Sequence, residues 1–171
     1  MTSKVFGIGL SRTGTTTLNH VLNEWGWETV HYPNERQLWD PRSHGATDIP
    51  VALHFRELDL KFPGSKFVYT VRNKERWLDS IVPYIERKRQ WKQSESQVNI
   101  RKQIYGSVFP NRNQADKAWD RHHGDVLGWF GNADRLLVID IVGGEPPSKL
   151  ADFLGVKTSM TEFPDMNRLK S

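Results

Sequence analysis

A glycine-rich turn between an apolar run and a helical run, close to the start of the chain, constrains the fold more than any other feature. Lys4–Leu10 is short, apolar and typical of a buried strand, and the turn Gly9–Gly14 follows it directly. From Thr15 to Trp25 apolar residues recur at helical spacing, and Gly26 is a natural helix end. A strand, a glycine turn and a helix in this order direct backbone N–H groups and a helix N-terminus at an anion.

The rest of the sequence alternates between strands and helices. We expect strands at Glu28–His31, Lys66–Val71 and Arg135–Val142, and helices at Pro50–Leu60, Lys74–Arg89 (kinked or limited by Pro83), Asn113–Phe130 and Pro146–Leu154. The polar segment Tyr32–Ile49 contains several Pro and Gly residues and is expected to be loop with one helical turn at most. This alternation predicts a three-layer α/β/α sandwich with a mostly parallel central sheet, in one domain over residues 1–171. The active crevice should lie at the carboxyl ends of the strands.

The segment Gly9-Leu10-Ser11-Arg12-Thr13-Gly14-Thr15-Thr16 has the layout of a P-loop. The mononucleotide version places a lysine directly after the second glycine, where it reaches the terminal phosphates. Thr15 stands at that position here, so the cation that holds the β and γ phosphates in an NTP kinase or NTPase is missing. A cation is nevertheless present in the loop, at Arg12. The alternative interpretation is a simple helix cap, because Thr caps helices well and glycine is common in turns.

A second polar motif follows the strand Lys66–Val71. The strand runs into Arg72, and Ser80 stands eight residues later on the expected helix. An arginine at the end of a strand offers a planar fork to a phosphate, and a serine two helical turns along can lie on the same side. The alternative is a surface salt bridge and a capping serine.

These two motifs resemble those of sulfotransferases that use 3'-phosphoadenosine 5'-phosphosulfate (PAPS), and the short bacterial type most closely. The resemblance implies a P-loop-containing nucleotide-binding-like fold. It also implies that Arg12, Thr13, Gly14, Thr15 and Thr16 bind the 5'-phosphosulfate, that Arg72 and Ser80 bind the 3'-phosphate, and that no metal is needed. Weaker similarities occur in the order typical of the family: Asp48-Ile49-Pro50, Phe62-Pro63-Gly64, Tyr105-Gly106, His122, Phe153-Leu154-Gly155 and Phe163–Asn167.

The same resemblance indicates Asp48 as the acceptor's base or orienting carboxylate. Cytosolic sulfotransferases carry a catalytic histidine before Leu-Pro, and Asp48 likewise precedes an x-Pro pair; the alternative is a helix cap. His54 is the second candidate and His31 the third. The chain departs from those enzymes at Ala46, where they have a lysine, and it lacks a clear Arg-Lys-Gly loop, for which Arg101–Lys102 is the candidate substitute.

Composition sets the remaining expectations. The chain has no cysteine, which excludes disulfides, thiolate metal sites and a cysteine nucleophile. We see no secretion signal and no apolar run long enough to span a membrane, and we expect a soluble cytoplasmic protein that acts on a small-molecule acceptor. The net charge of +4 and the basic stretch Glu86–Lys102 fit either a solvated helical face or a patch that binds anions.

Two other function classes stay open at this stage. The first is a small kinase or NTP-binding protein, which Thr15 disfavours. The second is a non-catalytic protein that binds nucleotides or nucleic acid through the basic stretch and turns over nothing.

Overall fold

The computed structural model describes residues 3–166 and divides the chain into two compact parts. The first part comprises residues 1–72 and 133–171, and the second comprises residues 73–132. The expected Phe163–Asn167 motif ends at Asn167, which lies outside the described residues. No helix within residues 3–166 is long and apolar enough to cross a membrane.

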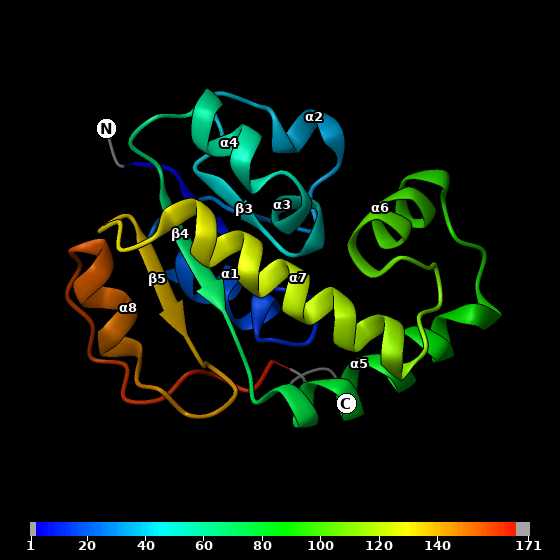
Figure 1. The fold of residues 1–171 in the computed structure, drawn as a ribbon. Coiled ribbons are helices and arrows are strands. Elements are labelled where there is room, and N and C mark those ends of the chain that lie inside the picture. Colours follow the sequence, from blue (N-terminus) through cyan, green and yellow to red (C-terminus); the bar gives the residue numbers. More distant parts are fainter. Residues whose placement is uncertain (1–2, 167–171) are drawn as a thin grey trace. The chain divides into compact units, whose positions relative to one another are not determined.

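The first part is built on a five-stranded, all-parallel sheet with the strand order β2-β3-β1-β4-β5 (Figure 1). Its elements are β1 (Val5–Gly7), α1 (Thr15–Glu24), β2 (Val30–His31), α2 (Glu35–Leu38), β3 (Gly45–Thr47), α3 (Ile49–Leu53), α4 (Phe55–Lys61), β4 (Lys66–Thr70), β5 (Leu136–Ile139) and α8 (Pro147–Leu154). The central position of β1 places the turn that follows it between the ends of β3 and β4. The predicted α/β fold with a parallel sheet is confirmed.

Alternating residues of β1 build the two helical layers. Val5 packs with Leu18 of α1 and Leu150 of α8 in one buried cluster. Phe6 points to the opposite face, where its ring centroid lies 6.0 Å from that of Phe62, just after α4. Successive strand residues face opposite sides of a sheet, so a strand with no polar side chain can only be covered on both faces. Helices therefore enclose β1 from both sides.

Two expectations for the polar region of the chain were wrong. The segment predicted as loop contains β3, a strand of three small or short residues between β2 and β1. Small size is required there, because a Cβ on Gly45 would lie 1.8 Å from the Val5 carbonyl oxygen. The helix predicted at Pro50–Leu60 is instead two helices, α3 and α4, that meet at His54.

The second part consists of helices only: α5 (Lys74–Glu86), a 3₁₀ turn η1 (Arg87–Gln90), α6 (Glu95–Tyr105) and α7 (Arg112–Phe130). Trp77 of α5 packs on Trp119 of α7 with ring centroids 4.8 Å apart. Pro83 does not end α5, which continues to Glu86. Lys74 binds Asp116 and Asp120 of α7, and these hydrogen bonds raise the pKa of the Lys74 ammonium. Ring stacking and ion pairs thus join the first and last helices of this part.

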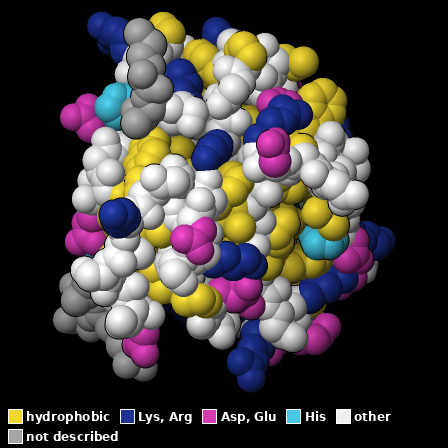
Figure 2. All heavy atoms as spheres, turned by 90° about the vertical axis from the view of Figure 1, so that its left-hand side faces the viewer, with side chains coloured by type: hydrophobic (Ala, Val, Ile, Leu, Met, Phe, Trp, Pro, Cys, Tyr) yellow, Lys and Arg dark blue, Asp and Glu magenta, His cyan; other side chains and the backbone are white. Residues whose placement is uncertain are grey.

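On the face drawn in Figure 2, Lys and Arg side chains are interspersed with Asp and Glu side chains. Hydrophobic side chains reach the surface between them. Positive and negative side chains are therefore mixed over the described part of this face.

Candidate active site

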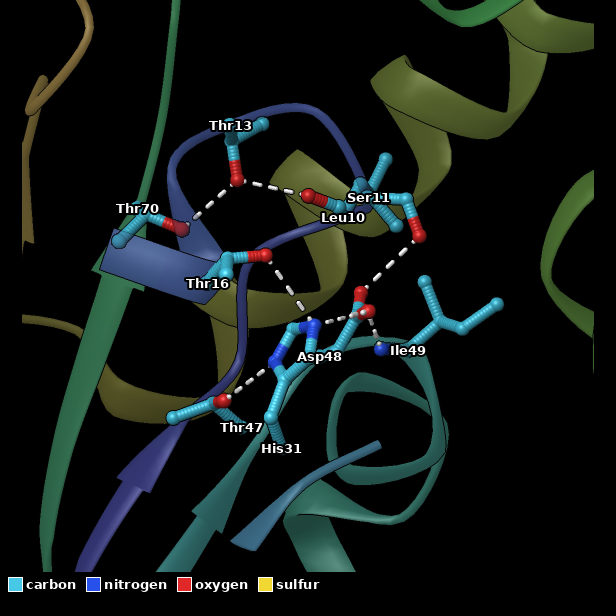
Figure 3. Close-up of polar contacts among 9 residues, drawn as sticks. All are labelled: Leu10, Ser11, Thr13, Thr16, His31, Thr47, Asp48, Ile49 and Thr70. Carbon is cyan, nitrogen blue, oxygen red and sulfur yellow. Dashed lines mark hydrogen bonds and ion pairs between the residues drawn. The ribbon is translucent and has the colours of Figure 1, made fainter. Parts of the chain in front are cut away.

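The glycine turn after β1, which we call the glycine loop (residues 9–16), packs closely against the end of β4 (Figure 3). Thr13 Oγ1 donates a hydrogen bond to the Leu10 carbonyl (2.7 Å) and also lies 2.7 Å from Thr70 Oγ1. The Thr13 proton is used by Leu10, so the Thr70 hydroxyl donates to Thr13. A Cβ on Gly9 would lie only 1.9 Å from Thr70 Oγ1. Glycine at this position is therefore what allows the loop to lie against β4.

The far end of the glycine loop is the N-terminus of α1. Gly14, the N-cap residue, has a left-handed backbone and no side chain to cap the helix, and the first turn of α1 contains no acidic residue. The positive end of the helix dipole is therefore not countered by a carboxylate of its own helix. Arg12 adds a cation within the loop, and Arg72 Nη1 donates to the Arg12 carbonyl oxygen at 3.4 Å. The Arg72 guanidinium thus contacts the backbone of a loop that contains a second arginine and leads into a helix N-terminus, an arrangement that suits a phosphate or sulfate.

Asp48 contacts the glycine loop from the other side, at the junction of β3 and α3. Its Oδ1 accepts hydrogen bonds from Ser11 Oγ and from the Ile49 amide, both at 2.9 Å. The side chain is only 9% exposed. Its backbone has φ 86° and ψ −176°, a region in which residues other than glycine are strained. Asp48 therefore caps α3, as one interpretation of the sequence held, and also contacts the loop.

His31, at the end of β2, contacts Thr16 of the glycine loop, Asp48 and Thr47. Its Nε2 lies 3.2 Å from Thr16 Oγ1 and 3.4 Å from Asp48 Oδ2, while its Nδ1 lies 3.0 Å from Thr47 Oγ1 (Figure 3). The glycine loop thereby contacts residues at the ends of β2, β3 and β4. Parallel strands bring these ends to one edge of the sheet, which is where the crevice was expected.

Comparison with known families assigns the chain. The family described as "Sulfotransferase domain" matches residues 36–171, which is most of the chain. The chain belongs to the sulfotransferase family. The match includes Arg72 and Ser80 but begins after the glycine loop, so the interpretation of the loop depends on its own sequence and geometry.

A solved structure agrees with the fold of this sulfotransferase chain. The structure is similar to a sulfotransferase from Alicyclobacillus acidocaldarius, with a TM-score of 0.58, 14% sequence identity and coverage of 96% of this chain and 85% of the other. It is also similar to mouse sulfotransferase SULT7A1, solved as a complex with PAP, at a TM-score of 0.49 and 15% identity. That match covers 99% of this chain and 62% of the mouse chain. No curated protein sequence matches the chain significantly.

The other residues predicted for the sulfotransferase site are placed as follows. His54 lies at the junction of α3 and α4, where its ring packs edge-on against Trp39 and its Nδ1 lies 3.8 Å from Glu57 Oε1. His54 thus makes no contact with the glycine loop in the described structure. Ser80 lies on α5 in the second part of the chain, and its pairing with Arg72 stays a prediction. The expectation that no metal is needed also stays a prediction.

Thr47 and Thr70 were not predicted as site residues, and Ser11 was placed in the glycine loop without a role of its own. All are at least nine-tenths buried, and each binds a side chain from another strand end or from the loop. Thr70 could have been found, because it is a hydroxyl residue at the carboxyl end of an apolar strand. Thr47 could not, since its strand was not predicted.

Proposed function

We propose that the chain, acting as one domain over residues 1–171 in the cytoplasm, binds PAPS at the glycine loop and transfers its sulfuryl group to a hydroxyl or amine of a small-molecule acceptor. The observation that carries the proposal is the contact of Arg72 with the Arg12 backbone, in a loop that contains an arginine but lacks the P-loop lysine. The close approach of Gly9 to β4 and the uncapped start of α1 fit a bound 5'-phosphosulfate. Arg72 and Ser80 would hold the 3'-phosphate.

The loop residues stabilise charge in this reaction. Sulfuryl transfer, like phosphoryl transfer, depends mainly on positioning and on charge stabilisation during in-line attack. As the bond between sulfur and the bridging oxygen breaks, its electron pair goes to the 5'-phosphate. Arg12, the α1 N-terminus and the hydroxyls of Thr15 and Thr16 would neutralise that negative charge.

Asp48 receives the acceptor's proton in the proposed mechanism. As the acceptor oxygen or nitrogen bonds to sulfur, its proton moves to the carboxylate. Asp48 Oδ1 already accepts two hydrogen bonds, whereas Oδ2 faces only Nε2 of His31 among the described contacts. Oδ2 is therefore the oxygen that has a lone pair left for the incoming proton. We favour Asp48 over His54 as the base because Asp48 contacts the glycine loop.

Calorimetric titration with adenosine 3',5'-bisphosphate (PAP) and with AMP, which lacks the 3'-phosphate, tests the proposal. We expect the wild type to prefer PAP and Arg72→Ala to lose most of this preference, by about 10- to 150-fold, since a charged hydrogen bond contributes roughly 1.5–3 kcal/mol. Arg36→Ala is the matched control, because Arg36 is exposed and its loss changes the net charge equally. A folded wild type that does not bind PAP would refute the proposal.

The kinase alternative predicts the opposite titration result. An NTP-binding protein should bind ATP with magnesium more tightly than PAP, although Thr15 in place of the lysine disfavours this outcome.

The nucleic-acid alternative depends on a free basic patch, and several of its side chains already have local partners. Arg89 pairs with Glu86 at 2.6 Å and lies over the ring of Phe109, while the buried Arg101 donates to Gln93. These contacts favour a structural role for much of the stretch. Binding to nucleic acid with a steep salt dependence, and without turnover, would support the alternative.

A further inference from the structure

The three contacts of His31 reach three different parts of the candidate site. Thr16 belongs to the loop that would hold the phosphosulfate, Asp48 is the proposed base, and Thr47 ends the neighbouring strand. We infer that His31 is a positioning residue that fixes the Asp48 carboxylate relative to Thr16. This inference rests on the function proposed above for the glycine loop and for Asp48.

The chemistry of the neighbours selects one tautomer of the His31 ring. An ionised carboxylate can only accept hydrogen bonds, so the ring nitrogen that faces Asp48 Oδ2 must carry the proton. That nitrogen is Nε2. Nδ1 is then the acceptor of the neutral ring, and the hydroxyl of Thr47, 3.0 Å away, donates to it. Because a hydroxyl can donate or accept, Thr47 satisfies Nδ1 in this tautomer, and the carboxylate of Asp48 is the group that selects it.

As a result, contacts at both carboxylate oxygens hold the Asp48 side chain in one orientation. Oδ1 accepts hydrogen bonds from Ser11 and Ile49, and Oδ2 lies 3.4 Å from His31 Nε2. Contacts on several sides are what a strained backbone such as that of Asp48 requires to persist. Without His31, Oδ2 would lose the one contact described for it, and the carboxylate could turn away from the acceptor.

One charged group lies directly against the His31 ring in the described structure. Among residues 3–166, Asp48 at the β3–α3 junction is the one charged group within hydrogen-bond or ion-pair distance of the ring, while α1 and β3 contribute the hydroxyls of Thr16 and Thr47. The His31 side chain is 31% exposed and is therefore accessible to solvent. Its tautomer therefore reports on the contacts of Nε2 with Asp48 and Thr16.

The test is imidazole ¹⁵N NMR of histidine-labelled full-length protein at about pH 8.5, where an ordinary histidine is neutral. His31→Gln assigns the signal by its disappearance. We expect the wild type to show the Nε2–H tautomer, and Asp48→Gly, which suits the backbone at that position, to shift the ring toward a mixture of tautomers. An Nδ1–H tautomer in the wild type would overturn the inference even if the variant failed to fold. An unchanged tautomer in folded Asp48→Gly would do the same.

Addition of PAP tests the connection to the glycine loop. We expect the His31 Nε2 signal to move when PAP binds, because Thr16 would turn its hydroxyl toward the 5'-phosphate. PAP binding by calorimetry without any change at Nε2 would overturn the proposed connection. Absence of PAP binding would instead refute the proposed function, and the tautomer measurement would still decide whether His31 holds Asp48.

Discussion

Replacing Asp48 by glycine or by alanine separates the strain of its backbone from the contacts of its side chain. Both substitutions remove the hydrogen bonds with Ser11 and Ile49 and the contact with His31 in the same way. They differ in the backbone, since φ 86° and ψ −176° are open to glycine but strained for alanine. The difference in stability between Asp48→Gly and Asp48→Ala therefore measures the strain at this position.

The expected magnitude follows from two opposing effects. A non-glycine residue in this region costs about 1–3 kcal/mol, which Asp48→Ala retains and Asp48→Gly relieves. Glycine in turn gives a more flexible unfolded chain, which costs about 0.4–1 kcal/mol. Asp48→Gly should thus be the more stable variant by about 1 kcal/mol, which for a chain of this length raises the melting temperature by roughly 2–4 °C.

Urea unfolding and calorimetry of the two variants measure this difference. The matched control is Asp152, an exposed residue in α8, where glycine should be less stable than alanine by about 1 kcal/mol. The sign of the difference is therefore expected to reverse between the two positions. If Asp48→Ala proves as stable as Asp48→Gly or more so, the backbone of Asp48 is not strained and the reasoning fails.

Three further substitutions test separate features of the first part of the chain. Gly9→Ala should lower the free energy of unfolding by about 1–3 kcal/mol in urea titrations, because its Cβ would lie 1.9 Å from Thr70 Oγ1; unchanged stability would contradict the close approach. The hydrogen bond from Lys149 lowers the pKa of Glu145, so this stabilisation is present above the ordinary carboxyl value of 4.5 and is lost as the pH falls. Calorimetry should accordingly show Glu145→Gln to be less stable than the wild type at neutral pH, with a difference that shrinks in acid and that would be pH-independent if the pairing were absent. His54→Gln should leave PAP affinity and turnover near wild type, whereas a loss of turnover of about 10²-fold with intact PAP binding would make His54 the base.

The elements that the sequence predicted correctly carry local signals. The first strand, the glycine turn and α1 follow one another with clear changes of apolar periodicity, and glycines or prolines mark the ends of most other elements. The break between α3 and α4 at His54 carries no such signal, since neither Gly nor Pro stands there. The position of this break could therefore not be predicted from the helix preferences of the residues around it.

The strand β3 shows why much of the site could not be predicted. Gly45–Thr47 is too short for any periodicity, and it is a strand only because β1 and β2 pair with it on its two sides. That pairing sets His31 opposite Thr47 and Gly7 opposite Thr47. Asp48 is therefore brought to the start of the glycine loop by the register of the sheet. The resemblance to sulfotransferases indicated Asp48 as a candidate, but its contacts depend on a strand that was missed.

Backbone strain is concentrated at this edge of the sheet. Within the described chain, three residues other than glycine have positive φ: Arg12 (73°), Tyr32 (53°) and Asp48 (86°). Arg12 lies in the glycine loop, Tyr32 directly follows His31, and Asp48 contacts both segments. Each such conformation persists only when its surroundings hold it in place, and strained residues of this kind cluster at functional sites. A fold could avoid this cost by placing glycine at all three positions, but glycine would remove the guanidinium and the carboxylate. The strain at Arg12 and Asp48 is therefore best explained by a requirement for charged side chains at positions whose backbone is set by the loop and by the strand ends.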